Sequence, residues 1–100
     1  MTVCGSRLAV MVVTNCHRTT AIVIRNDGRN VVLVPMSAGK LAAETLSFSD
    51  FRLQWEEADY ALERALATFL HLAAEHGATS EVKRGLVRLQ QRDSLIPSLF

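Results

Sequence analysis

Residues 19–36 read TTAIVIRNDGRNVVLVPM, and this stretch decides the fold. It holds two apolar runs rich in Val and Ile, residues 19–25 and 30–36, on either side of the turn residues Asn26–Arg29. Apolar runs of this length between turn signals are typical of strands. Asp27-Gly28 indicates a hairpin, because glycine accepts the positive φ that a tight turn requires. The stretch therefore predicts two antiparallel strands joined by a short loop.

A third run, Arg7–Thr14, precedes the hairpin and is followed by a second turn that ends at His17. Two short loops imply an antiparallel meander of three strands. Pro35 has no amide hydrogen to donate, so the third strand should end there or lie at an edge of the sheet. Residues 41–48 leave two interpretations open, a fourth short strand or the start of a helical turn.

The predicted strands alternate poorly between polar and apolar residues. Leu8–Val13 and Val31–Val34 are apolar at every position. An antiparallel sheet with one wet face normally alternates, so both faces of this sheet require cover. We expect the helices that follow to cover one face only. The other face then predicts a partner surface, most simply a second copy of the chain, and hence a homodimer.

From Asp50 onward the apolar residues recur at the period of a helix. Ser49 is the expected N-cap of a long amphipathic helix and Gly77 its C-terminal cap. Thr79 or Ser80 should cap a second helix that ends near Arg92, before Pro97. The apolar stripe of the long helix consists of Trp55, Ala58, Leu62, Ala65, Leu66, Phe69, Leu72 and Ala73, and that of the second helix of Val82, Leu86, Val87 and Leu89.

These elements predict an α+β fold, a three- or four-stranded antiparallel meander followed by a long amphipathic helix and a shorter C-terminal helix. With 100 residues, 49% of them hydrophobic, the chain is long enough for one domain with its own core. We divide this single domain, residues 1–100, into a β meander (1–48), a helical hairpin (49–92) and an apolar tail (93–100). The tail carries Leu95, Ile96, Leu99 and Phe100, which should dock either on the protein's own core or in a groove of a partner.

The net charge of +1 indicates neither a strongly basic nucleic-acid binder nor an acidic tail. Residues 50–76 carry six acidic and two basic side chains, so the long helix should present an acidic face. Glu56, Asp59 and Glu63 on that face are candidate partner-binding residues. No apolar run approaches the roughly 20 residues that span a bilayer, and the first residues do not read as a secretory signal. We therefore expect a cytoplasmic protein with reduced cysteines and no membrane partner.

No motif predicts catalysis, a metal or a cofactor. His71 and His76 lie five residues apart, about 140° around a helix, whereas two helical zinc ligands need a spacing of four. Cys4, Cys16 and His17 lack the second close-spaced pair of a structural zinc site. The glycines are single, so no phosphate-binding loop is present. The sequence thus predicts no catalytic, metal-binding or cofactor-binding residue, and the protein is expected not to be an enzyme.

Residues 72–89 form the most specific local pattern. Leu72-Ala73, a three-residue spacer and Gly77-Ala78-Thr79 precede a basic helix with Lys83, Arg84 and Arg88. This order resembles the helix-turn-helix segment of winged-helix repressors, in which the second helix recognises DNA. The sequence departs from that family at position 83, where Lys replaces the buried β-branched residue and Val stands one position earlier.

Two functions follow from these observations. The first is a non-catalytic protein–protein interaction module of the accessory, adaptor or inhibitor type, which acts as a homodimer and binds an unidentified protein. The alternative is a small DNA-binding regulator that uses the helix-turn-helix-like segment 72–89, with Lys83, Arg84 and Arg88 on the nucleic acid. The low net charge argues against the alternative, although a dimer would present two basic helices.

Overall fold

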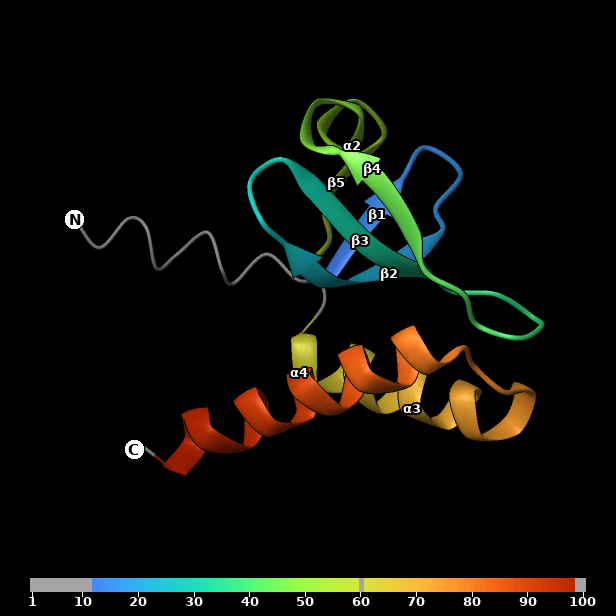
Figure 1. The fold of residues 1–100 in the computed structure, drawn as a ribbon, viewed down its shortest axis with the longest axis vertical. Coiled ribbons are helices and arrows are strands. Elements are labelled where there is room, and N and C mark those ends of the chain that lie inside the picture. Colours follow the sequence, from blue (N-terminus) through green and yellow to red (C-terminus); the bar gives the residue numbers. More distant parts are fainter. Residues whose placement is uncertain (1–11, 60, 99–100) are drawn as a thin grey trace.

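The structure is a computed structural model that describes residues 12–59 and 61–98, with side chains described as far as Gln91. Its elements are β1 (Val12–Asn15), β2 (Thr20–Asn26), β3 (Asn30–Pro35), β4 (Glu44–Ser47), α2 (Phe48–Gln54), β5 (Trp55–Glu57), α3 (Leu62–His76) and α4 (Ser80–Ser98). The strands form one antiparallel sheet in the order β4-β3-β2-β1-β5. Helix α2 lies on one side of this sheet, and α3 and α4 lie on the other (Figure 1). The α+β class with a sheet followed by two helices is therefore confirmed.

Local turn chemistry forms the two predicted hairpins. The Asn15 side chain accepts hydrogen bonds from the backbone N–H groups of His17 and Thr19 between β1 and β2. Between β2 and β3, Gly28 adopts a φ of 91°, and the Asp27 carboxylate accepts from two backbone N–H groups of the turn. The meander is confirmed from Val12 onward, while residues 7–11 of the first predicted strand lie outside the described residues.

The sheet has five strands, where three or four were expected. Residues 41–48, for which a strand and a helical turn were both considered, contain the fourth strand, because Glu44–Ser47 pairs with β3 at the edge of the sheet. The fifth, β5, pairs with β1 and aligns Trp55 with Asn15. Leu41 forms an isolated bridge with Ala78, and this bridge ties the loop after β3 to the turn between α3 and α4.

The prediction of one helical hairpin over residues 49–92, with a single helix over 50–76, is wrong. The Ser47 hydroxyl, rather than that of Ser49, accepts from the Asp50 N–H and starts α2 two residues early. Helix α2 ends at Gln54, because Trp55–Glu57 takes up hydrogen bonds with β1. Trp55 and Ala58 fit the helical period of α3 in the sequence, but a strand pairing with distant residues overrides that period.

The two long helices confirm other local signals. Gly77 caps the end of α3 with a φ of 86°, and its N–H donates to the Ala73 carbonyl. The Thr79 hydroxyl accepts from the Val82 N–H at the start of α4. Helix α4 was expected to be the shorter helix and to end near Arg92, yet it continues to Ser98 and has 19 residues against 15 in α3. Within the described ranges, no helix is long and apolar enough to cross a bilayer.

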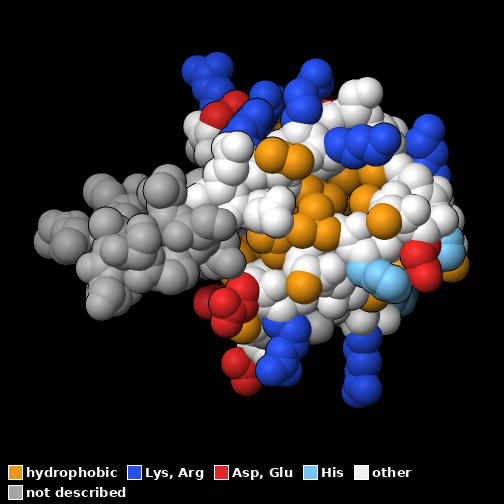
Figure 2. All heavy atoms as spheres, turned by 90° about the horizontal axis from the view of Figure 1, so that it is seen from below, with side chains coloured by type: hydrophobic (Ala, Val, Ile, Leu, Met, Phe, Trp, Pro, Cys, Tyr) orange, Lys and Arg blue, Asp and Glu red, His pale blue; other side chains and the backbone are white. Residues whose placement is uncertain are grey.

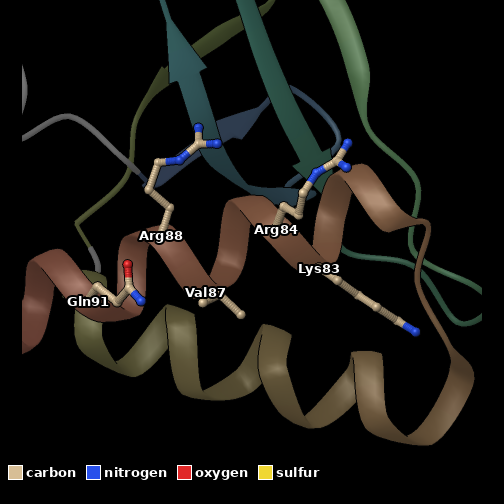
Figure 3. A pocket seen from close by; sticks show the side chains of 5 residues that line it. All are labelled: Lys83, Arg84, Val87, Arg88 and Gln91. Carbon is tan, nitrogen blue, oxygen red and sulfur yellow. The ribbon is translucent and has the colours of Figure 1, made fainter.

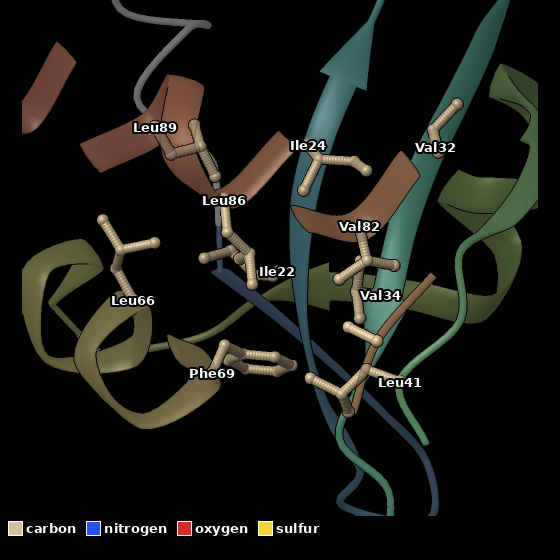
Figure 4. Close-up of a cluster of buried hydrophobic side chains, with 11 residues drawn as sticks. Ile22, Ile24, Val32, Val34, Leu41, Leu66, Phe69, Val82, Leu86 and Leu89 are labelled. Atoms are coloured by element: carbon tan, nitrogen blue, oxygen red, sulfur yellow. The ribbon is translucent and has the colours of Figure 1, made fainter. Parts of the chain in front are cut away.

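Both faces of the sheet are apolar, as predicted, and this chain covers both of them. One cluster packs Ile22, Ile24, Val32 and Val34 against α3 and α4 (Figure 4). On the opposite face, Ala21, Val23, Val31 and Leu33 pack against Phe51 and Trp55. The expectation that the second face needs a partner copy is therefore wrong, because the missed elements α2 and β5 supply its cover. Leu66 and Phe69 are core residues as predicted, but Trp55 belongs to the other face.

Candidate functional site

Helix α2 exposes more apolar surface than its length suggests. Its one inward residue, Phe51, anchors it to the sheet. Leu53 lies two positions later, about 200° around the helix, and is 84% exposed. Phe48, at the start of the helix, is 36% exposed. We call Phe48, Arg52 and Leu53, with the hollow described next, the α2 surface.

A hollow of about 660 Å³ lies between α2 and the β2–β3 turn. Val23 forms its floor from the sheet, and Phe48 and Phe51 contribute two rings whose centroids are 6.5 Å apart. The other lining residues are Asn26, Asp27, Gly28 and Arg52. A volume of this size, lined by three apolar and three polar or charged side chains, is typical of sites that receive a ligand or a partner's side chain.

Two opposite charges border this hollow. The Arg52 guanidinium lies over the Phe48 ring, 5.8 Å from its centroid. Hydrogen bonds from the backbone N–H groups of Asn30 and Arg29 lower the pKa of Asp27, and the positive charges of Arg25 and Arg29 add to the effect. Asp27 is therefore ionised at neutral pH. Among the described side chains, no carboxylate lies within ion-pair distance of Arg52.

The second candidate surface lies on α4. Arg84, Val87, Arg88 and Gln91 occur at steps of three and four and line a shallow hollow of about 380 Å³ together with Lys83 (Figure 3). All five are exposed, and the opposite stripe of α4 is buried in the core. Figure 2 shows Lys and Arg side chains gathered along the upper margin of the face that α3 and α4 form, with others at its lower margin. We call these five residues, with Arg25, the α4 surface.

Arg25 joins the α4 surface from the sheet. A smaller hollow of about 100 Å³ places Arg25 beside Arg84 and Arg88, with Glu81 at its rim. Helix α4 can approach β2 this closely because position 85 is glycine, where a β-carbon would lie 2.8 Å from Ile24 side-chain atoms. Sequence reasoning identified Lys83, Arg84 and Arg88 but missed Arg25, and only Gly85 within an otherwise regular helix could have signalled the contact.

The structure does not bring the predicted acidic residues onto one helix face. Glu56 lies in β5, Asp59 in the following loop and Glu63 in the first turn of α3. All three are exposed. Of the apolar tail, Leu95 and Ile96 fall within the backbone of α4, while Leu99 and Phe100 lie outside the described residues.

The histidines near the end of α3 surround one carboxylate. The Nε2 atoms of His71 and His76 lie 3.4 and 3.8 Å from the carboxylate oxygens of Glu75. No cluster of three or more His, Cys, Asp or Glu within the described ranges could hold a metal ion. Cys16 is exposed and free, and Cys4 lies outside the described residues.

Comparisons of the chain with protein families, curated proteins and solved structures identify no relative. No family model matches the chain, and no curated protein or solved structure matches it either.

Proposed function

We propose that the protein is a non-catalytic protein–protein interaction module, of the accessory, adaptor or inhibitor type, that acts as a homodimer through its α2 surface. The observation that carries this proposal is Leu53, a large apolar side chain that is 84% exposed on α2, on the side of the helix away from Phe51 and its hollow. Exposed apolar surface next to a hollow, with charged residues at its border, is typical of a protein interaction site.

The α2 surface is complementary to itself. In a twofold dimer each contact occurs twice, so the Leu53 side chain of one copy can enter the hollow of the other, and the reverse. Arg52 precedes Leu53 in the chain, and Asp27 borders the hollow that would receive Leu53. Because Arg52 and Asp27 border the same hollow, a twofold contact across the two hollows would bring the guanidinium of one copy toward the ionised carboxylate of the other. This charge match favours a second copy over a neutral apolar partner.

The rest of the chain supports a binding role rather than catalysis. Among the described residues, no polar or charged side chain is buried, and Asp27 is the one group with a clearly shifted pKa. Active sites typically hold buried titratable groups whose pKa values burial and neighbouring charges shift strongly. Two cysteines in 100 residues are too few for a disulfide framework, and we propose that the protein works in the cytoplasm.

Sedimentation velocity at concentrations from about 1 to 100 µM tests the proposal, because association follows mass action. We expect the unchanged protein to dimerise over this range and Leu53→Asp to remain monomeric. The matched control is Val87→Asp, which places the same charge on another exposed apolar residue, 46% exposed on α4. This control should dimerise like the unchanged protein.

Circular dichroism should show the same unfolding midpoint for monomeric Leu53→Asp as for the unchanged protein diluted to monomer, since Leu53 contributes little to the core. A protein that is monomeric at the highest concentration contradicts the proposal. So does a Leu53→Asp variant that dimerises as well as the Val87→Asp control, because the contact would then lie elsewhere.

A further inference from the structure

The α4 surface has a chemistry different from that of the α2 surface. Arg84, Val87, Arg88 and Gln91 form one exposed stripe along the helix, because residues separated by three and four positions share a face. Two guanidinium groups, a small apolar side chain and an amide thus lie on one exposed face of α4, where the guanidinium groups lean toward the sheet and Val87 lies on the side of α3 (Figure 3). Arg25 lies beside this stripe on β2.

We infer that the α4 surface binds double-stranded DNA, with the stripe of α4 facing the major groove. An α-helix fits the width of that groove. Arginine side chains bind phosphate oxygens in a planar fork, and a glutamine amide and a valine side chain suit the adenine edge and the thymine methyl group. Arg25 and Lys83 flank the stripe, and we assign them to phosphates at its two margins.

The basic groups of this surface are available to a ligand. Glu81 is the carboxylate nearest to them in the lining of the smaller hollow. Within the described residues, the ion pairs shorter than 4.0 Å join Glu75 to His71 and His76 and involve no arginine. Glu56, Asp59 and Glu63 belong to β5, the next loop and α3, and none of them lines the α4 hollows. The chain therefore has a locally basic surface even though its net charge is only +1.

The composition of the stripe favours duplex DNA over other polyanions. An acidic protein would use the same positive charges, and polyglutamate serves as its probe in the test below. An anionic membrane would require larger apolar side chains than Val87 beside the basic groups. Duplex RNA has a major groove too deep and narrow for a helix, so it should bind less tightly than duplex DNA.

The salt dependence of binding measures the number of phosphates contacted. Four basic side chains, Arg25, Lys83, Arg84 and Arg88, give an expected slope of about −3.6 in log K against log salt. Such a slope corresponds to a loss of affinity of roughly a hundredfold between about 50 and 200 mM salt. The α4 surface does not depend on the α2 contact. We therefore expect the monomeric Leu53→Asp variant to bind DNA too.

Fluorescence anisotropy with a labelled duplex of mixed sequence, about 20 base pairs long, tests this inference. The test variant is Arg84→Gln/Arg88→Gln, and its matched control is Arg18→Gln/Arg64→Gln, which removes the same charge from the β1–β2 turn and α3. We expect the test variant to lose at least about tenfold in affinity and about 1.8 units of slope. The control should change the affinity by less than about twofold, because its residues lie outside the α4 surface.

Three results would overturn the inference. The first is no binding to the duplex at about 50 mM salt, where phosphate contacts are strongest. The second is an equal loss of affinity in the test and control variants, which would indicate attraction by net charge alone. The third is tighter binding, at the same salt, to duplex RNA, polyglutamate or phosphatidylserine vesicles than to duplex DNA. Unfolding midpoints of all variants should match, since all four arginines are exposed.

Discussion

Replacing Gly85 with alanine tests how closely α4 packs on the sheet. The new β-carbon would lie 2.8 Å from both Cβ and Cδ1 of Ile24, closer than real β-carbons come to other atoms. Because Cβ of Ile24 is fixed to the backbone of β2, a rotamer change cannot relieve the contact, and α4 must move. Ile24 also lies at the bulge where the register between β2 and β3 shifts.

Two opposing effects decide the size of this change. Alanine gains about 1 kcal/mol over glycine in a helix interior. Overpacking a filled core costs about 1–3 kcal/mol, so we expect Gly85→Ala to lower the free energy of unfolding by up to about 2 kcal/mol. Urea denaturation measures this difference, provided that the dependence of the unfolding free energy on urea concentration is the same in both proteins. In thermal unfolding, each 1 kcal/mol corresponds to roughly 4–8 °C in the midpoint.

The matched control is Gly39→Ala, where the added β-carbon meets no atom within 4 Å and φ is not positive. We expect this control to be neutral or to stabilise by about 0.4–1 kcal/mol, through the entropy of the unfolded chain. If Gly85→Ala instead stabilises the protein by about 1 kcal/mol, as at an unhindered helix position, the close approach of α4 to β2 is refuted.

Three further changes test other contacts. Ser47→Ala removes the hydroxyl that caps α2 and should cost about 0.5–2 kcal/mol of unfolding free energy in urea, whereas Ser49→Ala should cost much less. Leu66→Ala should cost about 2–5 kcal/mol in the same assay, and a change well below 1 kcal/mol would mean that this side chain is not core. The folded state lowers the pKa of Asp27, so its stabilising contribution is present above the pKa of the unfolded chain and is lost as pH falls through the folded pKa. The unfolding midpoint should therefore drop more steeply on acidification in the unchanged protein than in Asp27→Asn, and parallel curves would contradict this assignment.

The sequence predicts those parts of the fold that depend on short-range chemistry. The β2–β3 hairpin follows from Asp27 and Gly28, which hold the turn by two hydrogen bonds and one positive φ. The end of α3 follows in the same way from Gly77. Each of these signals acts within a few residues, so no knowledge of the rest of the chain is needed.

The segment 48–57 shows where such reasoning fails. Trp55 continues the apolar spacing of α3 at steps of three and four, yet its backbone pairs with Asn15, forty positions away. A helical period describes spacing only, and it does not show that β1 has an open edge. From this one error follow the two others, the missing cover of the second sheet face and the acidic face assigned to a single helix.

The residues of the α4 surface that share one helix were predicted, whereas the residue that joins them by packing was not. Lys83, Arg84 and Arg88 share one helix, so spacing alone groups them. Arg25 joins them only through the packing of α4 on β2, which the sequence does not display. The exposure of Leu53 could not be predicted from a single helix over residues 50–76, because it depends on α2 being a separate short helix.

Fluorescence quenching of Trp55 by acrylamide in the monomeric Leu53→Asp variant tests the central claim most directly. Trp55 is the one tryptophan of the chain; it belongs to the cover of the second sheet face, beside Phe51 of α2, and is 8% exposed. If each copy covers the second face of its own sheet, quenching should be weak and equal in the monomeric variant and the dimeric protein. Strong quenching in the variant alone would mean that a second copy supplies this cover, and it would contradict the closed monomer on which both surfaces depend.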